Sequence, residues 1–251
     1  MAEHHHHPGH CHDFAEANKE HFNKDSDTYD DIPMVKEVTE KEGKYILSHG
    51  WTFNPESTTV LNFACGTGLL ETTLIAHCKY IQGVDISQGM VGQYNKRAET
   101  LGATSKMSAI AYELKGLPEE LEGRKFDVVL CTLAYHHFES TEEITRILAY
   151  FLKPGGVLLV TDGVSSDAMP NIEEDYEAIV STQDGLHRGG YEENLHGFKE
   201  WKLFLAKGVK PLYVNVWDDG DKTSSIRRQM QLELISVTFH VILFEPYEAK
   251  G

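Results

Sequence analysis

Long hydrophobic runs are missing from this sequence, and cysteines are few. None of its apolar runs reaches the roughly 18 residues that indicate a membrane-spanning helix, so we expect no such segment. The first residues are polar and rich in histidine, with no apolar stretch after them, which argues against a secretory signal peptide. The four cysteines, Cys11, Cys65, Cys78 and Cys131, form no CxxC pair and no regular framework. A reducing, intracellular setting therefore fits best, and we expect the cytoplasm, with the nucleus as the alternative.

Basic residues are also scarce. Lys and Arg together number 23 against 39 Asp and Glu, which gives a formal net charge of −16 at pH 7. Nucleic-acid binding is carried mainly by Lys and Arg that neutralise phosphates, and the sequence shows no basic stripe. We therefore expect neither a nucleic-acid nor a membrane partner. The acidic residues are spread along the chain, as in an ordinary soluble surface.

The first twelve residues, MAEHHHHPGHCH, have low complexity. Histidine and cysteine side chains of this kind can chelate Zn, Ni or Cu. The segment is either an engineered addition or a native tail, and we expect residues 1–12 to be disordered in both cases. The candidate metal ligands are His4, His5, His6, His7, His10 and His12, together with Cys11.

The rest of the chain, residues 13–251, is expected to form a single domain around one core, since 41% of the residues are hydrophobic. Residues 13–55 carry apolar side chains at helical spacings. After residue 58, short apolar runs alternate with amphipathic stretches, which indicates βαβ units and a parallel sheet, and hence an α/β fold. The expected strands are Val60–Ala64, Tyr80–Val84, Lys106–Ala111, Phe126–Cys131 and Val157–Thr161.

Beyond Thr161 this alternation loosens. Residues 163–197 are acidic and punctuated by glycine, and a helix is expected over Phe198–Lys207. Two further apolar runs, Leu212–Trp217 and Ser236–Phe244, close the chain and predict its last strands within residues 211–251.

The stretch VLNFACGTGLLETT, residues 60–73, places Gly66 and Gly68 between the first of these strands and a helix-like segment. Open α/β sheets bind ligands outside the carboxyl ends of their strands. Glycine there allows a close backbone approach and positive φ, and a helix N-terminus offers unpaired N–H donors. The alternative is that these glycines only form a tight turn.

The next strand ends in Asp85. A carboxylate at that point can accept hydrogen bonds from both hydroxyls of a ribose. The alternative role for Asp85 is an N-cap for the helix that follows. The glycine turn and Asp85 together predict an adenosine-containing cofactor, and both NAD and S-adenosylmethionine fit these two features.

Four further segments distinguish these cofactors. They are VDISQGMVGQYNKRAE (84–99), FDVVLC (126–131), LAYHHF (133–138) and LKPGGVLLV (152–160). In this order they resemble the class I S-adenosylmethionine-dependent methyltransferases, in particular the small-molecule type that includes ubiquinone- and menaquinone-biosynthesis enzymes. The resemblance covers about residues 58–162. It implies a Rossmann-like, doubly wound sheet of seven strands that is mostly parallel and ends in an antiparallel C-terminal hairpin.

The resemblance also implies roles for individual residues. The glycine turn would hold the methionine part of the cofactor, and Asp85 would bind the ribose. Asn62 stands where the family usually has an acid, and Ala64 where it often has a glycine, so Asn62 keeps hydrogen-bonding capacity but loses a charge. The cofactor-binding residues so implied are Asn62, Ala64, Cys65, Gly66, Thr67, Gly68, Asp85, Ile86, Met90, Ala111, Tyr112, Thr132, Leu133 and Ala134.

Methyl transfer from a sulfonium is an in-line displacement in which proximity and alignment do most of the work, and a base is needed only when the nucleophile carries a proton. His136 and His137 follow the fourth strand at the expected active-site edge, and Tyr135 is expected to shape the pocket. The alternative is that one of the histidines only caps or packs the next helix. Residues 13–55 are expected to form a helical lid, in which Phe14, Phe22 and Tyr29 close on the cofactor, and residues 164–210 a substrate-covering insertion.

The resulting hypothesis is an enzyme that moves a methyl group from S-adenosylmethionine to an O, N or S nucleophile of a small molecule. Two alternatives stay open: a regulatory or binding protein with a methyltransferase fold, and a methyltransferase that acts on a protein partner. The sequence does not name the acceptor.

Overall fold

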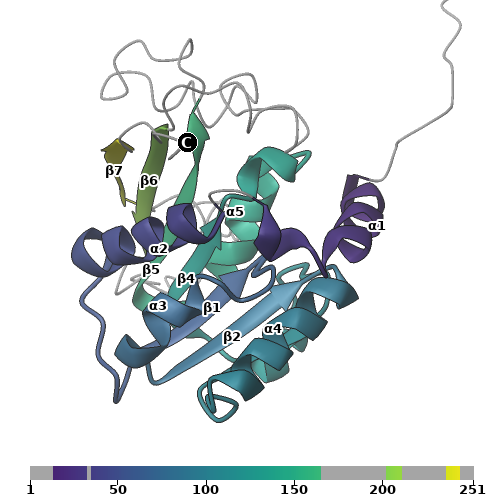
Figure 1. Ribbon diagram of the computed structural model, residues 1–251. Helices are drawn as coiled ribbons and strands as arrows, with labels where there is room; N and C mark the ends of the chain where they lie inside the picture. Colours follow the sequence, from purple (N-terminus) through teal and green to yellow (C-terminus); the bar gives the residue numbers. More distant parts are fainter. Residues whose placement is uncertain (1–13, 33–34, 165–201, 211–235, 244–251) are drawn as a thin grey trace, which may run out of the picture.

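The computed structural model describes residues 14–32, 35–164, 202–210 and 236–243. Figure 1 shows a central sheet with helices packed around it. The elements, in chain order, are α1 (Phe14–Asp25), η1 (Tyr29–Asp31), α2 (Val35–Tyr45), η2 (Ile46–Gly50), β1 (Thr59–Phe63), α3 (Glu71–Leu74), η3 (Ile75–His77), β2 (Tyr80–Asp85), α4 (Gln88–Thr100), β3 (Met107–Ala111), η4 (Glu120–Gly123), β4 (Phe126–Thr132), η5 (Tyr135–His137), α5 (Thr141–Tyr150), β5 (Leu152–Val164), β6 (Lys202–Val209) and β7 (Ser236–Leu243).

The strands form one sheet in the order β3-β2-β1-β4-β5-β6-β7. Strands β1 to β5 pair in parallel, whereas β6 pairs antiparallel with β5 and β7 pairs antiparallel with β6. The predicted Rossmann-like α/β fold, mostly parallel with an antiparallel C-terminal pair, is confirmed. The strand order reverses between β1 and β4, and open sheets of this kind bind ligands at such a switch point.

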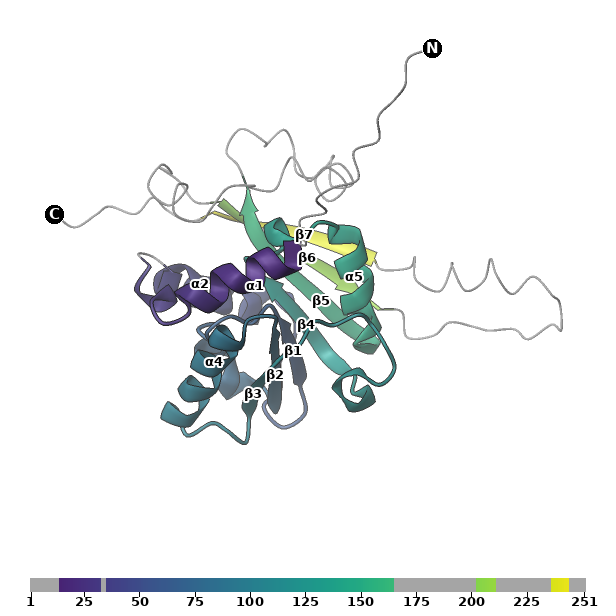
Figure 2. The same cartoon turned by 90° about the vertical axis from the view of Figure 1, so that its right-hand side faces the viewer.

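Helices cover both faces of the sheet, with α4 on one side and α5 on the other (Figure 2). Successive residues of a strand point to opposite faces, so β4 contributes to two cores. Val128 and Leu130 belong to the core that includes Tyr94 of α4. Val129 and Cys131 belong to the core that includes Leu148 of α5. The uninterrupted apolar run of β4 follows from this burial on both faces.

Serine residues start the two longer helices that follow β2 and β4. Ser87 Oγ accepts a hydrogen bond from the backbone N–H of Met90, and Ser140 Oγ accepts one from Glu143. Each bond satisfies one of the free N–H groups at a helix start and contributes about 1 kcal/mol. α4 begins shortly after the carboxyl end of β2, whereas α5 begins after the η5 turn that follows β4.

One expected element is wrong. The segment Phe198–Lys207 was expected to be a helix within an insertion, but Lys202–Val209 forms strand β6, whose residues pair with Val157–Val164 of β5. Leu205 is fully buried in that position. Pairing with an otherwise open edge of β5 outweighs a short stretch of ambiguous helical spacing. The expected strand Leu212–Trp217 lies outside the described residues, whereas β7 falls within the expected run Ser236–Phe244.

Within the described ranges, no helix combines the length and apolar character needed to cross a membrane. The same part of the chain contains no cluster of three or more His, Cys, Asp or Glu side chains arranged to hold a metal ion. The six histidines of residues 1–12 lie outside it, so their metal binding stays a prediction.

Candidate cofactor-binding site

The glycine turn follows β1 and has a left-handed backbone. Ala64, Gly66 and Gly68 have φ of 56°, 55° and 81°. A Cβ at Gly66 would meet no atom within 4 Å, whereas a Cβ at Gly68 would lie 2.9 Å from Cδ2 of Tyr94. Gly66 therefore leaves open space for a ligand, and Gly68 allows α4 to pack closely under the turn.

Asp85, at the end of β2, is joined to this turn. Its Oδ2 accepts the backbone N–H of Gly66 at 2.9 Å, and its Oδ1 accepts that of Ser87 at 2.9 Å. Burial raises the pKa of the carboxyl, and the bonds from Ser87 and Gly66 act in the opposite direction. A carboxylate has about four lone-pair sites, so these bonds leave acceptor capacity for a ribose hydroxyl. The N-cap of α4 is Ser87, and the alternative role of Asp85 as that cap is wrong.

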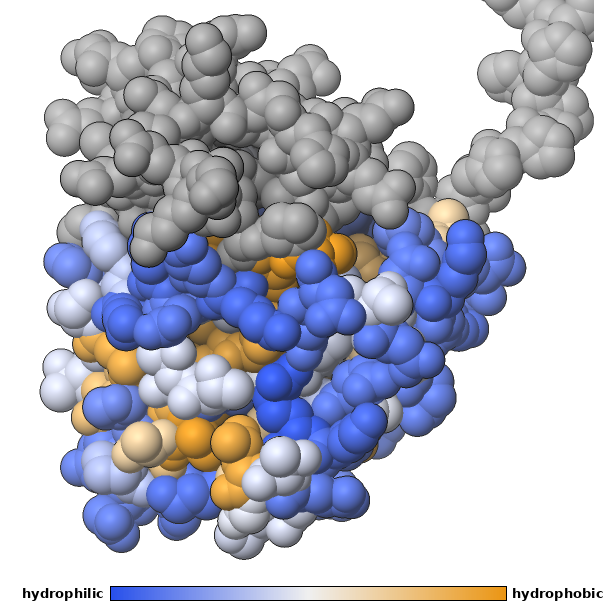
Figure 3. Space-filling model, viewed as in Figure 1, coloured by the Kyte–Doolittle hydropathy of each residue, from blue (hydrophilic) through white to orange (hydrophobic). Residues whose placement is uncertain are grey.

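A cavity opens between these two features and the segment after β4. Its empty volume, which includes space open to solvent, is about 640 Å³. Around it the outward surface of α1 and α4 is hydrophilic (Figure 3). The lining residues are Asn18, Phe22, Tyr29, Phe63, Ala64, Gly66, Asp85, Ile86, Met90, Thr132, Leu133, Ala134, His137 and Phe138.

Most of the residues predicted to bind the cofactor lie in this wall. They come from three separate segments that the parallel sheet brings to one edge. They are Ala64, Gly66, Asp85, Ile86, Met90, Thr132, Leu133 and Ala134.

Six predicted residues are absent from the wall that the described residues form. The thiol of Cys65 is buried in the core below the turn, and Gly68 packs on Tyr94. Ala111 pairs with Asp85 in the sheet, and the N–H of Tyr112 donates to the carbonyl of Asp85. The other two are Thr67, whose hydroxyl donates to Asp30, and Asn62.

Asn62 is buried beneath the turn, where its Nδ2 donates to Oε1 of Glu71 at 2.7 Å. Glu71 is fully buried at the start of α3, and burial raises the pKa of its carboxyl to about 7. A carboxyl group therefore lies beside Asn62, where the family usually has an acid. It belongs to Glu71, nine residues later in the chain. Sequence reasoning missed Glu71, although an acid in an otherwise apolar helix start was a visible signal.

Among the three predicted catalytic residues, only His137 lines the cavity. The ring of His136 turns away, and its Nδ1 lies 2.8 Å from Oδ1 of Asp162. Its backbone N–H also donates to Oδ2 of the same carboxylate at 2.9 Å. Tyr135 is buried, with its hydroxyl 3.1 Å from that of Thr145. His136 and Tyr135 therefore make contacts that hold the η5 turn, and their predicted roles in the active site stay predictions.

The imidazole of His137 sits in an apolar environment. Burial, and secondly the neighbouring His136, lower its pKa to about 3. Its ring meets the ring of Phe22 edge-on, with centroids 5.2 Å apart. The side chain is therefore neutral near pH 7 and can accept a hydrogen bond without carrying charge.

Residues of the N-terminal segment complete the wall. Phe22 and Tyr29, expected in the lid, line the cavity, and so does Asn18, which was not foreseen. The side-chain amide of Asn18 donates to the carbonyl of His137 at 3.0 Å. Sequence reasoning also missed Phe63 and Phe138. Phe63 is the last residue of β1, and Phe138 directly follows η5. Their positions next to the expected turns were the only available signal.

The sheet order, the glycine turn after β1 and the carboxylate that ends β2 together define the fold of the class I S-adenosylmethionine-dependent methyltransferases. Residues 60–156 of the chain therefore match a methyltransferase domain, since the family model that they match is described as "Methyltransferase domain".

Relatives agree with this assignment. The chain is 35% identical over 173 residues to a protein of Schizosaccharomyces pombe described as an uncharacterized methyltransferase, a match that covers 65% of this chain. The chain spans 60% of that relative's length. It is also 29% identical over 101 residues to a ubiquinone biosynthesis O-methyltransferase of Coxiella burnetii, across 39% of this chain and 41% of that protein.

Solved structures share the fold at low identity. A magnesium protoporphyrin IX methyltransferase from Synechocystis PCC 6803 superposes with a TM-score of 0.53 at 15% identity, over 78% of this chain and 99% of that one. A geranyl diphosphate C-methyltransferase from Streptomyces coelicolor A3(2) gives a TM-score of 0.53 at 13% identity, over 71% and 76% of the two chains.

Proposed function

We propose that this protein transfers a methyl group from S-adenosylmethionine to an O, N or S atom of a small molecule. The observation that carries the proposal is the bond between the Gly66 N–H and Asp85, which joins the glycine turn and the end of β2 at one cavity. The three buried cysteines Cys65, Cys78 and Cys131 are free thiols, which fits a reducing compartment such as the cytoplasm.

The residues of the wall fit this cofactor. Asp85 has acceptor capacity left for a ribose hydroxyl, and Gly66 leaves the space that a Cβ would fill. Ile86 and Met90 offer apolar surface to an adenine ring, and Thr132–Ala134 also lines the cavity, where it would lie beside the methyl donor. When bound, S-adenosylmethionine supplies a methyl group on a sulfonium. The chain holds the acceptor in line with it and excludes water.

Aromatic side chains form a further part of the cavity wall. Phe22, Tyr29, Phe63 and Phe138 line it, with the neutral imidazole of His137 among them. Among the described lining residues there is no Lys or Arg to pair with a carboxylate or phosphate. We therefore infer an uncharged, largely apolar or aromatic acceptor whose nucleophilic atom lies near His137. An acceptor that carries a proton would donate a hydrogen bond from it to the neutral imidazole of His137, and the proton would be released to solvent with the methylated product.

Calorimetric titration with S-adenosylhomocysteine tests cofactor binding. The wild-type protein should bind, and Asp85→Ala should raise Kd at least tenfold, because about 1.4 kcal/mol is lost with the ribose bonds. Glu56→Gln, a change at an exposed carboxylate away from the cavity, is the control and should bind as the wild type does. Circular dichroism of Asp85→Ala checks that the fold persists. Absence of any binding heat or thermal shift in the wild type would overturn the proposal.

The substitution of the usual acid by Asn62 favours one alternative, a binding or regulatory protein with this fold. Radiolabelled S-adenosylmethionine, incubated with the protein and cell extract, separates the possibilities. Label in small organic molecules supports the proposal. Label in a protein band indicates a protein acceptor, and binding without label transfer indicates a regulatory role.

A further inference from the structure

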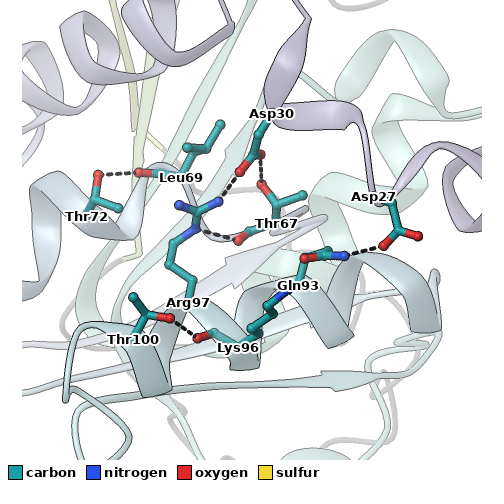
Figure 4. Close-up of polar contacts among 9 residues, drawn as sticks. All are labelled: Asp27, Asp30, Thr67, Leu69, Thr72, Gln93, Lys96, Arg97 and Thr100. Carbon is teal, nitrogen blue, oxygen red and sulfur yellow. Dashed lines mark hydrogen bonds and ion pairs between the residues drawn. The ribbon is translucent and has the colours of Figure 1, made fainter.

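Thr67, in the middle of the glycine turn, is held from outside the cavity by a three-residue contact (Figure 4). Its hydroxyl donates to Oδ1 of Asp30 at 2.6 Å. Its backbone carbonyl accepts a bond from Nε of Arg97 at 2.9 Å. Arg97 Nη2 and Asp30 Oδ2 form an ion pair that closes the ring of contacts. We call Asp30, Thr67 and Arg97 the clasp.

The clasp joins three parts of the molecule. Asp30 lies in η1 of the N-terminal segment, Thr67 in the glycine turn and Arg97 in α4. The Asp30 and Arg97 side chains are only 27% and 21% exposed, and their bonds to Thr67 are charge-assisted. Such bonds are shorter and stronger than hydrogen bonds between neutral groups, and partial burial reduces the screening that weakens exposed ion pairs. The side chain and the main chain of one turn residue are thus fixed together.

The N-terminal segment also rests on α4 further along. Oδ1 of Asn23 accepts bonds from the Ser87 hydroxyl at 2.8 Å and from the Gly89 N–H at 2.9 Å. Nε2 of Gln93 donates to Oδ1 of Asp27 at 2.5 Å. Like Asp30, Asp27 uses its carboxylate to contact a side chain of α4. Unlike Asp30, it does not contact the glycine turn.

The same segment covers the cavity. Asn18, Phe22 and Tyr29 line it, and Asn18 is bonded to the carbonyl of His137. Phe22 contacts the rings of both Tyr29 and His137. A cofactor held in the cavity therefore lies between this cover and the turn to which the cover is bonded.

We propose that Asp30 is a positioning residue that couples the N-terminal segment over the cavity (residues 14–32, called the cover) to the cofactor-binding glycine turn. With the clasp closed, the cover holds Thr67 and with it the backbone of the glycine turn. When the cover lifts, Thr67 loses the Asp30 bond and the turn loosens its hold on the ligand. The inference rests on the proposed function for the identity of the ligand, but the coupling between cover and turn does not depend on it.

Asp30→Asn tests the coupling, with Asp27→Asn as the matched control. Hydrogen–deuterium exchange without ligand should rise in Asp30→Asn for peptides covering both residues 20–32 and the glycine turn, residues 64–70. In Asp27→Asn the turn should exchange as in the wild type. An unchanged turn in Asp30→Asn overturns the coupling, whether or not the protein binds S-adenosylhomocysteine.

The ligand readout is the dissociation rate of S-adenosylhomocysteine, measured by stopped flow. Asp30→Asn should dissociate at least about tenfold faster, and Asp27→Asn at the wild-type rate. Thr67→Ser keeps the hydroxyl and should dissociate S-adenosylhomocysteine at the wild-type rate. Thr67→Val lacks the hydroxyl and should dissociate it as fast as Asp30→Asn does. This pair of variants separates positioning from loss of fold if Asp30→Asn is unstable. Equal rates in Thr67→Ser and Thr67→Val contradict the clasp. A wild type that binds nothing removes the proposed function and leaves the exchange result to decide the coupling.

Discussion

Burial keeps the imidazole of His137 neutral. Removing the imidazolium from water costs free energy, and the ring of His136, with its centroid 4.0 Å away, would add repulsion if both were charged. Together these effects lower the pKa of His137 to about 3. A base works best when its pKa is near the working pH, so His137 is better suited to accept a hydrogen bond from the substrate than to take its proton fully.

Replacing His137 by Ala should reduce kcat about tenfold, the effect of losing one substrate hydrogen bond, while the Kd for S-adenosylhomocysteine stays the same. The kcat values of the wild type and of His137→Ala should depend on pH in the same way near pH 6.5, because His137 is already neutral there. Steady-state kinetics across about pH 5.5 to 8 checks both points. His77→Ala, at an exposed histidine, should match the wild type. An inflection near pH 6.5 that disappears in His137→Ala would contradict the assigned neutral state.

At the scale of elements, the turn between β1 and α3 combines two demands. It must approach a ligand closely on one side, and on the other it must let α4 pack beneath it. Gly66 meets the first demand and Gly68 the second, since only the Cβ of an alanine at 68 would clash with the Tyr94 ring. Both positions have positive φ, so any larger residue also adds backbone strain.

Gly68→Ala should lower the free energy of unfolding by about 2–4 kcal/mol, since backbone strain and the overlap with Tyr94 add. Gly66→Ala should lower it by about 1–2 kcal/mol from strain alone, yet weaken S-adenosylhomocysteine binding more than tenfold because its Cβ enters the cavity. Urea unfolding and calorimetry measure the two effects. Gly92→Ala, inside α4 with no atom within 4 Å of its Cβ, should raise stability slightly. An equal loss of stability at positions 66 and 68 would be inconsistent with the two separate roles.

At the scale of the whole molecule, Glu42 joins the N-terminal helices to the sheet. It lies on α2, and its Oε1 accepts a hydrogen bond from the Thr161 hydroxyl of β5. The side chain is fully buried, and burial raises its pKa to about 8. The folded protein therefore holds a proton on Glu42 at a pH where the unfolded chain has released it. Glu71, with its pKa raised to about 7, behaves in the same way.

These two groups should reduce stability as pH rises. The folded state binds more protons than the unfolded state between about pH 4.5 and 8, so each group lowers the free energy of unfolding by up to about 1.4 kcal/mol per pH unit in its window. Glu42→Gln keeps an oxygen acceptor for Thr161 and carries no charge. It should be more stable than the wild type near pH 8, with the difference shrinking toward pH 5.

Urea unfolding at about pH 5, 6.5 and 8 measures this difference. Glu40→Gln on the same helix is the control, because Glu40 is exposed and its pKa is lowered by Lys44, mainly through their hydrogen bond. A stability difference between Glu42→Gln and the wild type that stays constant across this range would show that Glu42 does not hold its proton in the folded state.

The sequence by itself determined the parallel sheet, the glycine turn and the carboxylate at its second strand. Each of these is a local pattern: a strand buried on both faces must be apolar throughout, and a left-handed turn favours glycine. Their meeting at one edge follows from parallel pairing alone. The predicted positions Ala64, Gly66, Asp85 and Met90 accordingly line the cavity.

Only the tertiary structure decided which of several neighbouring candidate residues has its side chain in the cavity wall. His136 and His137 are adjacent, but Asp162 of β5 draws the first away and leaves the second in the cavity wall. Thr67 turns out to Asp30, and Asn62 finds Glu71 below the turn. These side-chain orientations depend on partners up to 37 residues away in the chain. No local pattern encodes them, because packing and hydrogen bonding between separate elements set them.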